Sequence, residues 1–189
     1  MNEIKRCEWC IKTPFEMEYH DTEWGVPLHD DRKLFEFLIL DAFQAGLSWR
    51  TILNKRENFR FAFDNFDAVL IAEYNQDKFD ELMNYSGIIR NKLKIQAAIT
   101  NAQKFLKTTE EFGTFDNYIW QFSDYKVIQN KRTKMSDIPT KSDISDNMSK
   151  DMQKRSFKFV GTTICYAFMQ AMGMVNDHVI DCFRYKDLS

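Results

Sequence analysis

Apolar residues recur along most of this chain at the three-to-four-residue spacing of amphipathic helices. The clearest case lies between Asp30 and Gly46, where apolar side chains stand on nearly every side of the expected helix. This pattern predicts a central helix that is buried all round. Asp30 or Asp31 can cap its start, and Gly46 can end it. Ser48 can cap a second helix, which we expect to reach Phe63.

A helical hairpin is predicted in the middle of the chain. Asn75 can cap a helix that stops at Ser86-Gly87, and a further helix rises from about Asn91 and keeps helical spacing as far as Leu106. A single glycine between two amphipathic helices is most often a plain turn. The hairpin taken alone is therefore weak evidence for nucleic-acid binding.

The last third of the chain is less regular. Residues 126–146 are polar, include Pro139 and lack periodicity, so we expect an exposed loop or a small subdomain there. One helix is predicted from about Lys154 to Gly173, followed by a short helical turn that holds His178 and Cys182. Alternation of Val, Ile and Thr with polar residues is nowhere long enough for a strand, so the predicted fold class is all-α.

Composition agrees with packed helices in one domain spanning residues 1–189, with two helical lobes. Aromatic residues reach 15%, whereas the chain holds only six Gly and three Pro. No leader sequence and no apolar run of membrane-spanning length is visible, so we expect a cytoplasmic protein. The formal charge of -2 gives no overall attraction to polyanions, so any nucleic-acid binding must come from a local basic face.

Cysteines and histidines near the two ends of the chain suggest a metal site. His178 and Cys182 are four residues apart, a spacing that places two ligands on one face of a helix. Cys7 and His20 can complete a Cys2His2 set, which would fill a tetrahedral zinc site and make the metal structural. Two alternatives remain: these residues are ordinary buried thiols and histidines, or Cys10 replaces Cys7, because Cys-x2-Cys is itself a common zinc half-site.

One carboxylate interrupts the central apolar helix. Burying an ionised Asp41 costs several kcal/mol unless partners or a raised pKa compensate. A role at the floor of a ligand pocket, where the carboxylate accepts hydrogen bonds from the edge of a nucleobase, would explain the buried Asp41. The alternative is that Asp41 lies near the helix end and faces water. Aromatic rings near this corner could stack on a flipped base, although any single one could belong to the core: Trp9, Tyr19, Trp24 and Trp49.

Longer motifs follow one another over almost the whole chain. They are Arg6-Cys7 with Trp9, YHDTEWGVP at 19–27, QAGLSW at 44–49, KRENF at 55–59, GIIR at 87–90, KIQA at 94–97, FKFVGTTICY at 157–166 and VNDHV at 175–179. In this order they resemble the bacterial DNA-3-methyladenine glycosylase I family.

The resemblance implies a helix-hairpin-helix DNA glycosylase fold with one structural zinc ion that joins the N- and C-terminal segments. It implies that the zinc ligands are Cys7, His20, His178 and Cys182, so that Cys10 does not bind the metal. It also implies that Tyr19 and the catalytic residue at position 41 hydrogen-bond the excised base, that Trp49 stacks on it, and that Trp9 and Trp24 line the pocket. The family usually has Glu where this chain has Asp41, so either the backbone shifts or a water bridges the gap.

The implied activity is base-excision repair: hydrolysis of the N-glycosidic bond of 3-methyladenine, flipped out of alkylated double-stranded DNA by a monomeric enzyme. The hairpin Gly87-Ile88-Ile89-Arg90 would bind the DNA backbone, with Lys92 and Lys94 adding positive charge. A second basic cluster, Lys131, Arg132 and Lys134, is typical of solvated surface. The alternative functions are a non-catalytic, zinc-stabilised DNA-binding domain that lost activity through the change to Asp41 and, less well supported, a metalloenzyme.

Overall fold

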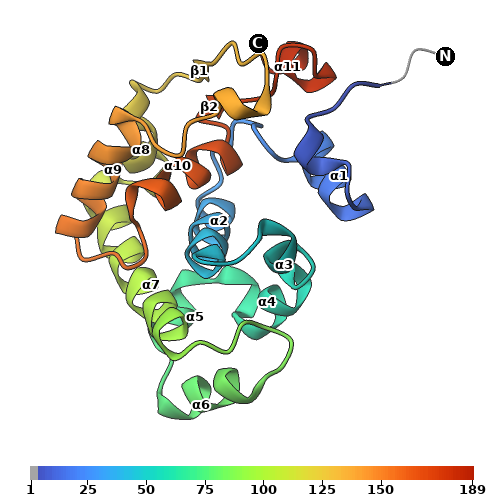
Figure 1. Ribbon diagram of the computed structural model, residues 1–189. Helices are drawn as coiled ribbons and strands as arrows, with labels where there is room; N and C mark the ends of the chain where they lie inside the picture. The colour runs from blue at the N-terminus through green and yellow to red at the C-terminus, as the bar shows by residue number, and fades with distance from the viewer. Residues whose placement is uncertain (1–3) are drawn as a thin grey trace.

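The computed structural model describes residues 4–189, and helices dominate it (Figure 1). The α-helices are α1 (Pro14–Thr22), α2 (Asp31–Gln44), α3 (Trp49–Leu53), α4 (Arg56–Ala62), α5 (Ala68–Ala72), α6 (Gln76–Asn84), α7 (Lys92–Phe112), α8 (Phe115–Trp120), α9 (Asp143–Lys154), α10 (Thr162–Ala171) and α11 (Phe183–Asp187). Short 3-10 helices are η1 (Glu8–Cys10), η2 (Asp64–Phe66), η3 (Gln121–Ser123) and η4 (Met135–Asp137). The all-α prediction is confirmed, with one small exception described below.

Helix α2 is the centre of the fold and packs against α3, α7, α8 and α10. The Asp30 carboxylate accepts a hydrogen bond from the backbone N–H of Lys33 at 2.9 Å and so caps the first turn. Every residue from Leu34 to Phe43 is buried. The helix stops before Gly46, whose φ of +76° is one that an L side chain rarely adopts. The predicted central buried helix is thus confirmed.

The single helix predicted from Ser48 to Phe63 is two helices, α3 and α4, so this prediction was wrong. Ser48 caps α3 as expected, but the backbone N–H of Lys55 bonds to the carbonyl of Ile52 and closes a tight turn. The turn changes the direction of the chain. It lets Phe59 and Phe63 pack on Phe43 of α2, with ring centroids 4.8 and 5.8 Å from that ring.

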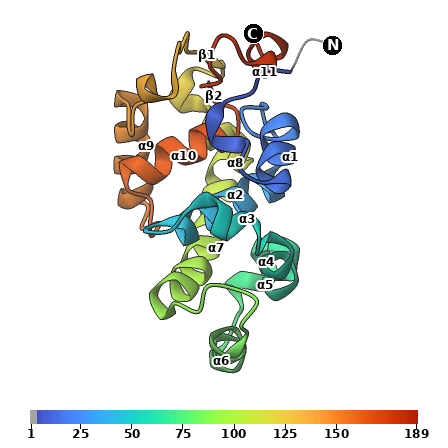
Figure 2. The same cartoon turned by 45° about the vertical axis from the view of Figure 1, so that its right-hand side comes forward.

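The predicted hairpin is formed by α6 and α7, which are seen at the lower end of the molecule in Figure 2. Asn75 and Asn91 cap the two helices by accepting hydrogen bonds from the N–H groups of Lys78 and Lys94. Lys55 also holds the turn between the helices, because its Nζ donates to the carbonyls of Ser86 and Gly87 at 3.1 and 3.2 Å. Helix α7 continues past Leu106 to Phe112.

The helix predicted from Lys154 to Gly173 is also wrong, because α9 ends at Lys154 and α10 begins only at Thr162. Between them Ser156 and Phe159 adopt positive φ values of 72° and 54°, which no helix continues. Helix α9 starts at Asp143, within the segment expected to be a loop. Its first turn is held by reciprocal hydrogen bonds between Ser142 and Ser145.

Two strands of two residues each, β1 (Ile128–Gln129) and β2 (Val175–Asn176), pair in parallel. The N- and C-terminal segments also lie side by side (Figures 1 and 2), and the N–H of Phe183 donates to the carbonyl of Lys5 at 3.0 Å. Within residues 4–189, none of the helices combines the length and the apolar character that a membrane span requires.

Candidate active site and metal centre

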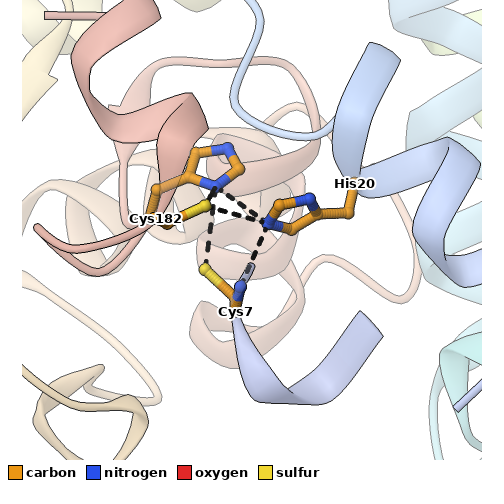
Figure 3. Close-up of side chains that lie close together, drawn as sticks. Cys7, His20 and Cys182 are labelled. Atoms are coloured by element: carbon orange, nitrogen blue, oxygen red, sulfur yellow. Dashed lines mark hydrogen bonds between the residues drawn. The ribbon is translucent and has the colours of Figure 1, made fainter. Parts of the chain in front are cut away.

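The two ends of the described chain meet at a cluster of four buried side chains, Cys7, His20, His178 and Cys182. One nitrogen or sulfur atom from each lies within 4.8 Å of the others. Figure 3 shows the side chains of Cys7, His20 and Cys182 pointing toward one another from separate segments. The closest separations are 3.2 Å (His20 Nε2 to His178 Nδ1), 3.4 Å (His20 Nε2 to Cys182 Sγ), 3.5 Å (His178 Nδ1 to Cys182 Sγ) and 3.7 Å (Cys7 Sγ to His178 Nδ1).

These separations suit a metal ion. Zinc bound tetrahedrally at about 2.0–2.1 Å from nitrogen and about 2.3 Å from sulfur holds its ligand atoms about 3.3–3.8 Å apart. The chemistry of the set agrees, because two imidazoles and two thiolates are the ligands that zinc prefers in structural sites. The four buried residues can therefore hold a metal ion.

Hydrogen bonds around the cluster fix which imidazole nitrogens face inward. His20 Nδ1 donates to the Asp21 carboxylate at 2.8 Å, and His178 Nε2 donates to the main-chain oxygen of Trp24 at 3.0 Å. Each inward nitrogen, Nε2 of His20 and Nδ1 of His178, is therefore left as an acceptor. Arg6 in turn holds Asp21 through two guanidinium nitrogens. A hydrogen bond from the Cys7 thiol lowers the pKa of the Cys182 thiol, which favours the ligating thiolate.

The argument from helical spacing at His178 and Cys182 was wrong, although both residues do meet in the cluster. Residues 178–182 form a turn, in which the N–H of Cys182 donates a hydrogen bond to the carbonyl of Val179 at 2.7 Å. Helix α11 starts only at Phe183. Cys10 is not a member of the cluster. Its thiol instead donates a hydrogen bond to the carbonyl of Cys7 at 3.1 Å.

A cavity of about 400 Å³ opens beside the cluster. The aromatic residues singled out from the sequence, Trp9, Tyr19, Trp24 and Trp49, all line it together with Asp41. The rings of Trp9 and Trp24 meet edge to face with centroids 5.1 Å apart, and Tyr19 lies 5.2 Å from Trp49. The sequence hypothesis of an aromatic pocket with one carboxylate is consistent with this arrangement.

Other lining residues were not singled out beforehand. The segment expected to be an exposed loop or a small subdomain contributes Met135, Ile138, Pro139 and Thr140. No periodicity or motif marks that segment. Gln44 and the α10 residues Thr163 and Tyr166 lie inside recognisable motifs, which could have marked them; the wall also includes Ala167, Gln170 and Ala171.

Asp41 is 2% exposed, so the alternative in which it faces water is wrong. Burial raises the pKa of its carboxyl group well above 3.8. Its Oδ2 has no hydrogen-bond partner within residues 4–189, and neither do the indole nitrogens of Trp9 and Trp49. Buried polar groups in proteins are almost always paired, so three unpaired ones among the residues that line one cavity are consistent with a ligand that supplies partners.

Tyr19 shares this environment. Its pKa is raised well above 10.0, first by burial and then by the charge of Asp41. The hydroxyl group therefore keeps its proton at neutral pH and can donate a hydrogen bond to a ligand.

The predicted backbone-binding hairpin is only partly exposed. Arg90 and Lys92 face solvent, Gly87 and Ile89 are half-buried, and Ile88 belongs to the core.

Lys94 does not add charge to this surface, so that prediction was wrong. Its Nζ is turned inward and donates to the carbonyls of Phe43 and Ala45, at 2.8 and 2.6 Å, where α2 ends. In the second basic cluster Lys131 and Lys134 are exposed, whereas Arg132 pairs with the buried Asp177 at 3.2 Å.

Comparison with known proteins identifies the chain. Residues 9–185 match the model of the methyladenine glycosylase family. The chain is 47% identical to DNA-3-methyladenine glycosylase 1 of Escherichia coli over 96% of its length and 97% of that protein. It is 44% identical to DNA-3-methyladenine glycosylase of Haemophilus influenzae, over 94% of this chain and 96% of the relative.

The fold agrees with the sequence. A solved structure of 3-methyladenine DNA glycosylase I from Staphylococcus aureus, which describes the recognition of 3-methyladenine by that enzyme, superposes with a TM-score of 0.92 at 33% identity, covering 95% of this chain and 96% of the other. The resemblance seen in the sequence is confirmed, and the chain belongs to the methyladenine glycosylase family.

Proposed function

We propose that this protein is a DNA repair glycosylase that hydrolyses the N-glycosidic bond of 3-methyladenine in alkylated double-stranded DNA. The observation that carries the proposal is the buried Asp41, whose Oδ2 is unpaired at an aromatic cavity in a member of this family. A cavity of about 400 Å³ is in the range of small-molecule sites, and the target nucleotide must leave the base stack to enter it.

The electronic character of the cavity suits the damaged base. Methylation at N3 gives adenine a positive charge, which weakens the glycosidic bond and makes the base a good leaving group. Trp49 stacks on the flipped base, and Trp9 and Trp24 line the pocket around it. A cation over such rings gains about 0.5–2 kcal/mol. An undamaged adenine lacks this charge and so gains less.

Asp41 acts as the catalytic residue in this proposal. Its carboxylate accepts hydrogen bonds from the edge of the base and favours the cationic form while water attacks C1′ of the sugar. Tyr19 donates a second hydrogen bond to the base. Asp is one methylene shorter than the Glu usual in the family, and a bridging water or a small backbone shift closes the difference.

The hairpin between α6 and α7 binds the DNA backbone, as in helix-hairpin-helix proteins. Arg90 and Lys92 provide exposed positive charge, and the backbone N–H groups of Lys92 and Leu93, which begin α7 ahead of the capped Lys94, can bind a phosphate. The residues proposed for this contact are Gly87, Ile89, Arg90 and Lys92; Ile88, which was also expected from the sequence, is buried in the core. A local basic face is needed because the net charge of the whole chain is -2.

We assign the metal of the Cys/His cluster as one zinc ion per chain. Cys7, His20, His178 and Cys182 would fill all four positions of a tetrahedral ion, so the zinc would stabilise the fold and take no part in hydrolysis. It would join the N- and C-terminal segments of a single, monomeric glycosylase domain.

The experiment is to incubate the purified protein with DNA treated with a methylating agent and to assay free 3-methyladenine. Release at a rate well above that of DNA alone is expected. The rival is a DNA-binding domain that lost activity through Asp41. Such a domain would bind methylated DNA but release no base, and its Asp41→Glu variant would regain release. That combination of results would contradict the proposal.

A further inference from the structure

Lys94 joins the proposed DNA-binding hairpin to the end of α2, and the mechanism above does not use it. It stands in the first turn of α7, next to the N–H groups of Lys92 and Leu93 proposed to bind a phosphate. Its side chain turns inward, and the residue is 7% exposed. The Nζ atom donates to the carbonyls of Phe43 and Ala45 at 2.8 and 2.6 Å. One side chain therefore spans from the helix end that would hold the DNA backbone to the helix end beside the cavity.

The connection between α2 and α3, residues 45–48, is held at few points. The residues on either side of it, Gln44 and Trp49, line the cavity. A Cβ at Gly46 would meet no atom within 4 Å beyond its chain neighbours, so nothing packs against the middle of the connection there. In the described part of the chain, the hydrogen bond that ties this connection to a distant segment is the one from Lys94.

The separation between these two helix ends matters for base removal. A flipped nucleotide stays attached to the DNA backbone while its base enters a pocket. The place where the protein holds the backbone and the place where the cavity opens must therefore lie at a fixed distance from each other. A misplacement of about 1 Å can slow catalysis by about 100-fold.

We propose that Lys94 is a positioning residue for base removal, an inference that rests on the proposed glycosylase function. By bonding to the end of α2, Lys94 fixes Gln44 and Trp49 relative to the phosphate-binding end of α7. A second lysine supports the same junction from the other side, because Lys55 bonds to two carbonyls of the hairpin turn. A lysine that only capped α2 would add stability without changing the rate of a folded molecule.

Lys94→Met tests this role through three measurements, made at a temperature at which urea unfolding shows the variant to be folded. The single-turnover rate of 3-methyladenine release at saturating methylated DNA should fall at least about tenfold. The Kd for an undamaged duplex and the Kd for free 3-methyladenine should each stay within about twofold of the wild type, because the hairpin and the pocket both remain.

Three results would overturn the proposal. An unchanged rate per folded molecule would leave Lys94 a cap of α2 and nothing more. A parallel loss of affinity for free 3-methyladenine would show that the pocket itself has loosened. A loss confined to duplex affinity would make Lys94 a DNA-binding residue instead.

Two further variants keep the test decisive. Lys107→Met changes an exposed lysine on the same helix, outside the proposed DNA contact, and should release the base at the wild-type rate. If Lys94→Met does not fold, Lys94→Gln keeps an N–H donor for one of the two carbonyls on a shorter side chain, and its release should be slower by at least about threefold. A folded Lys94→Gln that releases the base at the wild-type rate overturns the proposal.

The failure of this proposal and the failure of the glycosylase function give different results. A wild type that releases no base refutes the glycosylase function itself. An active wild type with Lys94 variants that release the base equally fast refutes only the role of Lys94.

Discussion

His178 Nε2 donates a hydrogen bond to the main-chain oxygen of Trp24 at 3.0 Å, and the two rings meet edge to face with centroids 4.5 Å apart. Trp24 lines the cavity, whereas His178 belongs to the Cys/His cluster. The cluster and the cavity therefore share a wall. His178 thus contacts both the backbone and the ring of one residue of the pocket.

Cys182→Ala should remove both the metal and much of the stability, because it takes away one of four ligands that join distant segments. We expect metal analysis to change from about one zinc per chain to none. The free energy of unfolding should fall by about 3 kcal/mol or more. Thermal unfolding with and without a chelator measures the second effect.

Cys10→Ala is the matched control, because this buried thiol lies three residues from Cys7 and outside the cluster. It should keep the metal. A Cys182→Ala protein that still binds zinc stoichiometrically would show that the four-residue assignment is incorrect.

Asp41 should make the stability of the protein depend on pH. Its pKa is raised in the folded protein above the value of 3.8 because the carboxyl group is buried. Its contribution to stability is therefore fully present below pH 3.8 and is lost as the pH rises through the folded pKa. Relative to Asp41→Asn, the wild type should lose up to about 1.4 kcal/mol of stability per pH unit across that window.

Urea unfolding of both proteins at several pH values measures this difference, and the contributions of other groups cancel when the curves are subtracted. A difference that stays constant with pH, or that favours the wild type increasingly as the pH rises, would contradict the burial of an unpaired carboxyl group.

Lys94→Met should destabilise the protein although a lysine is usually a surface residue. The Lys94 ammonium group bonds to the carbonyls of Phe43 and Ala45, and its removal leaves both without that partner. The expected loss in the free energy of unfolding is about 2–3 kcal/mol. Lys92→Met, at an exposed position two residues earlier, should change it by less than about 0.5 kcal/mol. Equal losses in the two variants would mean that Lys94 does not cap α2.

The sequence predicted those features that depend on local patterns. The central helix, with its cap at Asp30 and its end at Gly46, follows from one apolar run, and the α6–α7 hairpin follows from Asn caps and helical spacing. Asp41 was identified because a carboxylate is conspicuous in an apolar run. The ligand set depended on resemblance, since spacing alone left Cys7 and Cys10 equally eligible.

Features that depend on long-range contacts could not be predicted. No glycine or proline marks the turn near Lys55 or the break directly after Lys154. Both places are held by contacts with distant segments: Lys55 bonds to the carbonyls of Ser86 and Gly87, and the backbone of Lys158 bonds to the Asn101 side chain. Strands of two residues are too short to show alternation. The inward turn of Lys94 is likewise set by α2, about 50 positions earlier in the chain, so no pattern around position 94 could show it.

The most direct test of the central claim is the single-turnover rate of 3-methyladenine release from methylated DNA, measured for the wild type, Asp41→Asn and the exposed control Asp80→Asn. We predict release by the wild type and by Asp80→Asn at similar rates, with Asp41→Asn slower by about 100-fold, because Asp41 would act on the leaving base itself. Equal rates in all three proteins would remove Asp41 from the mechanism, and no release by the wild type would contradict the glycosylase function.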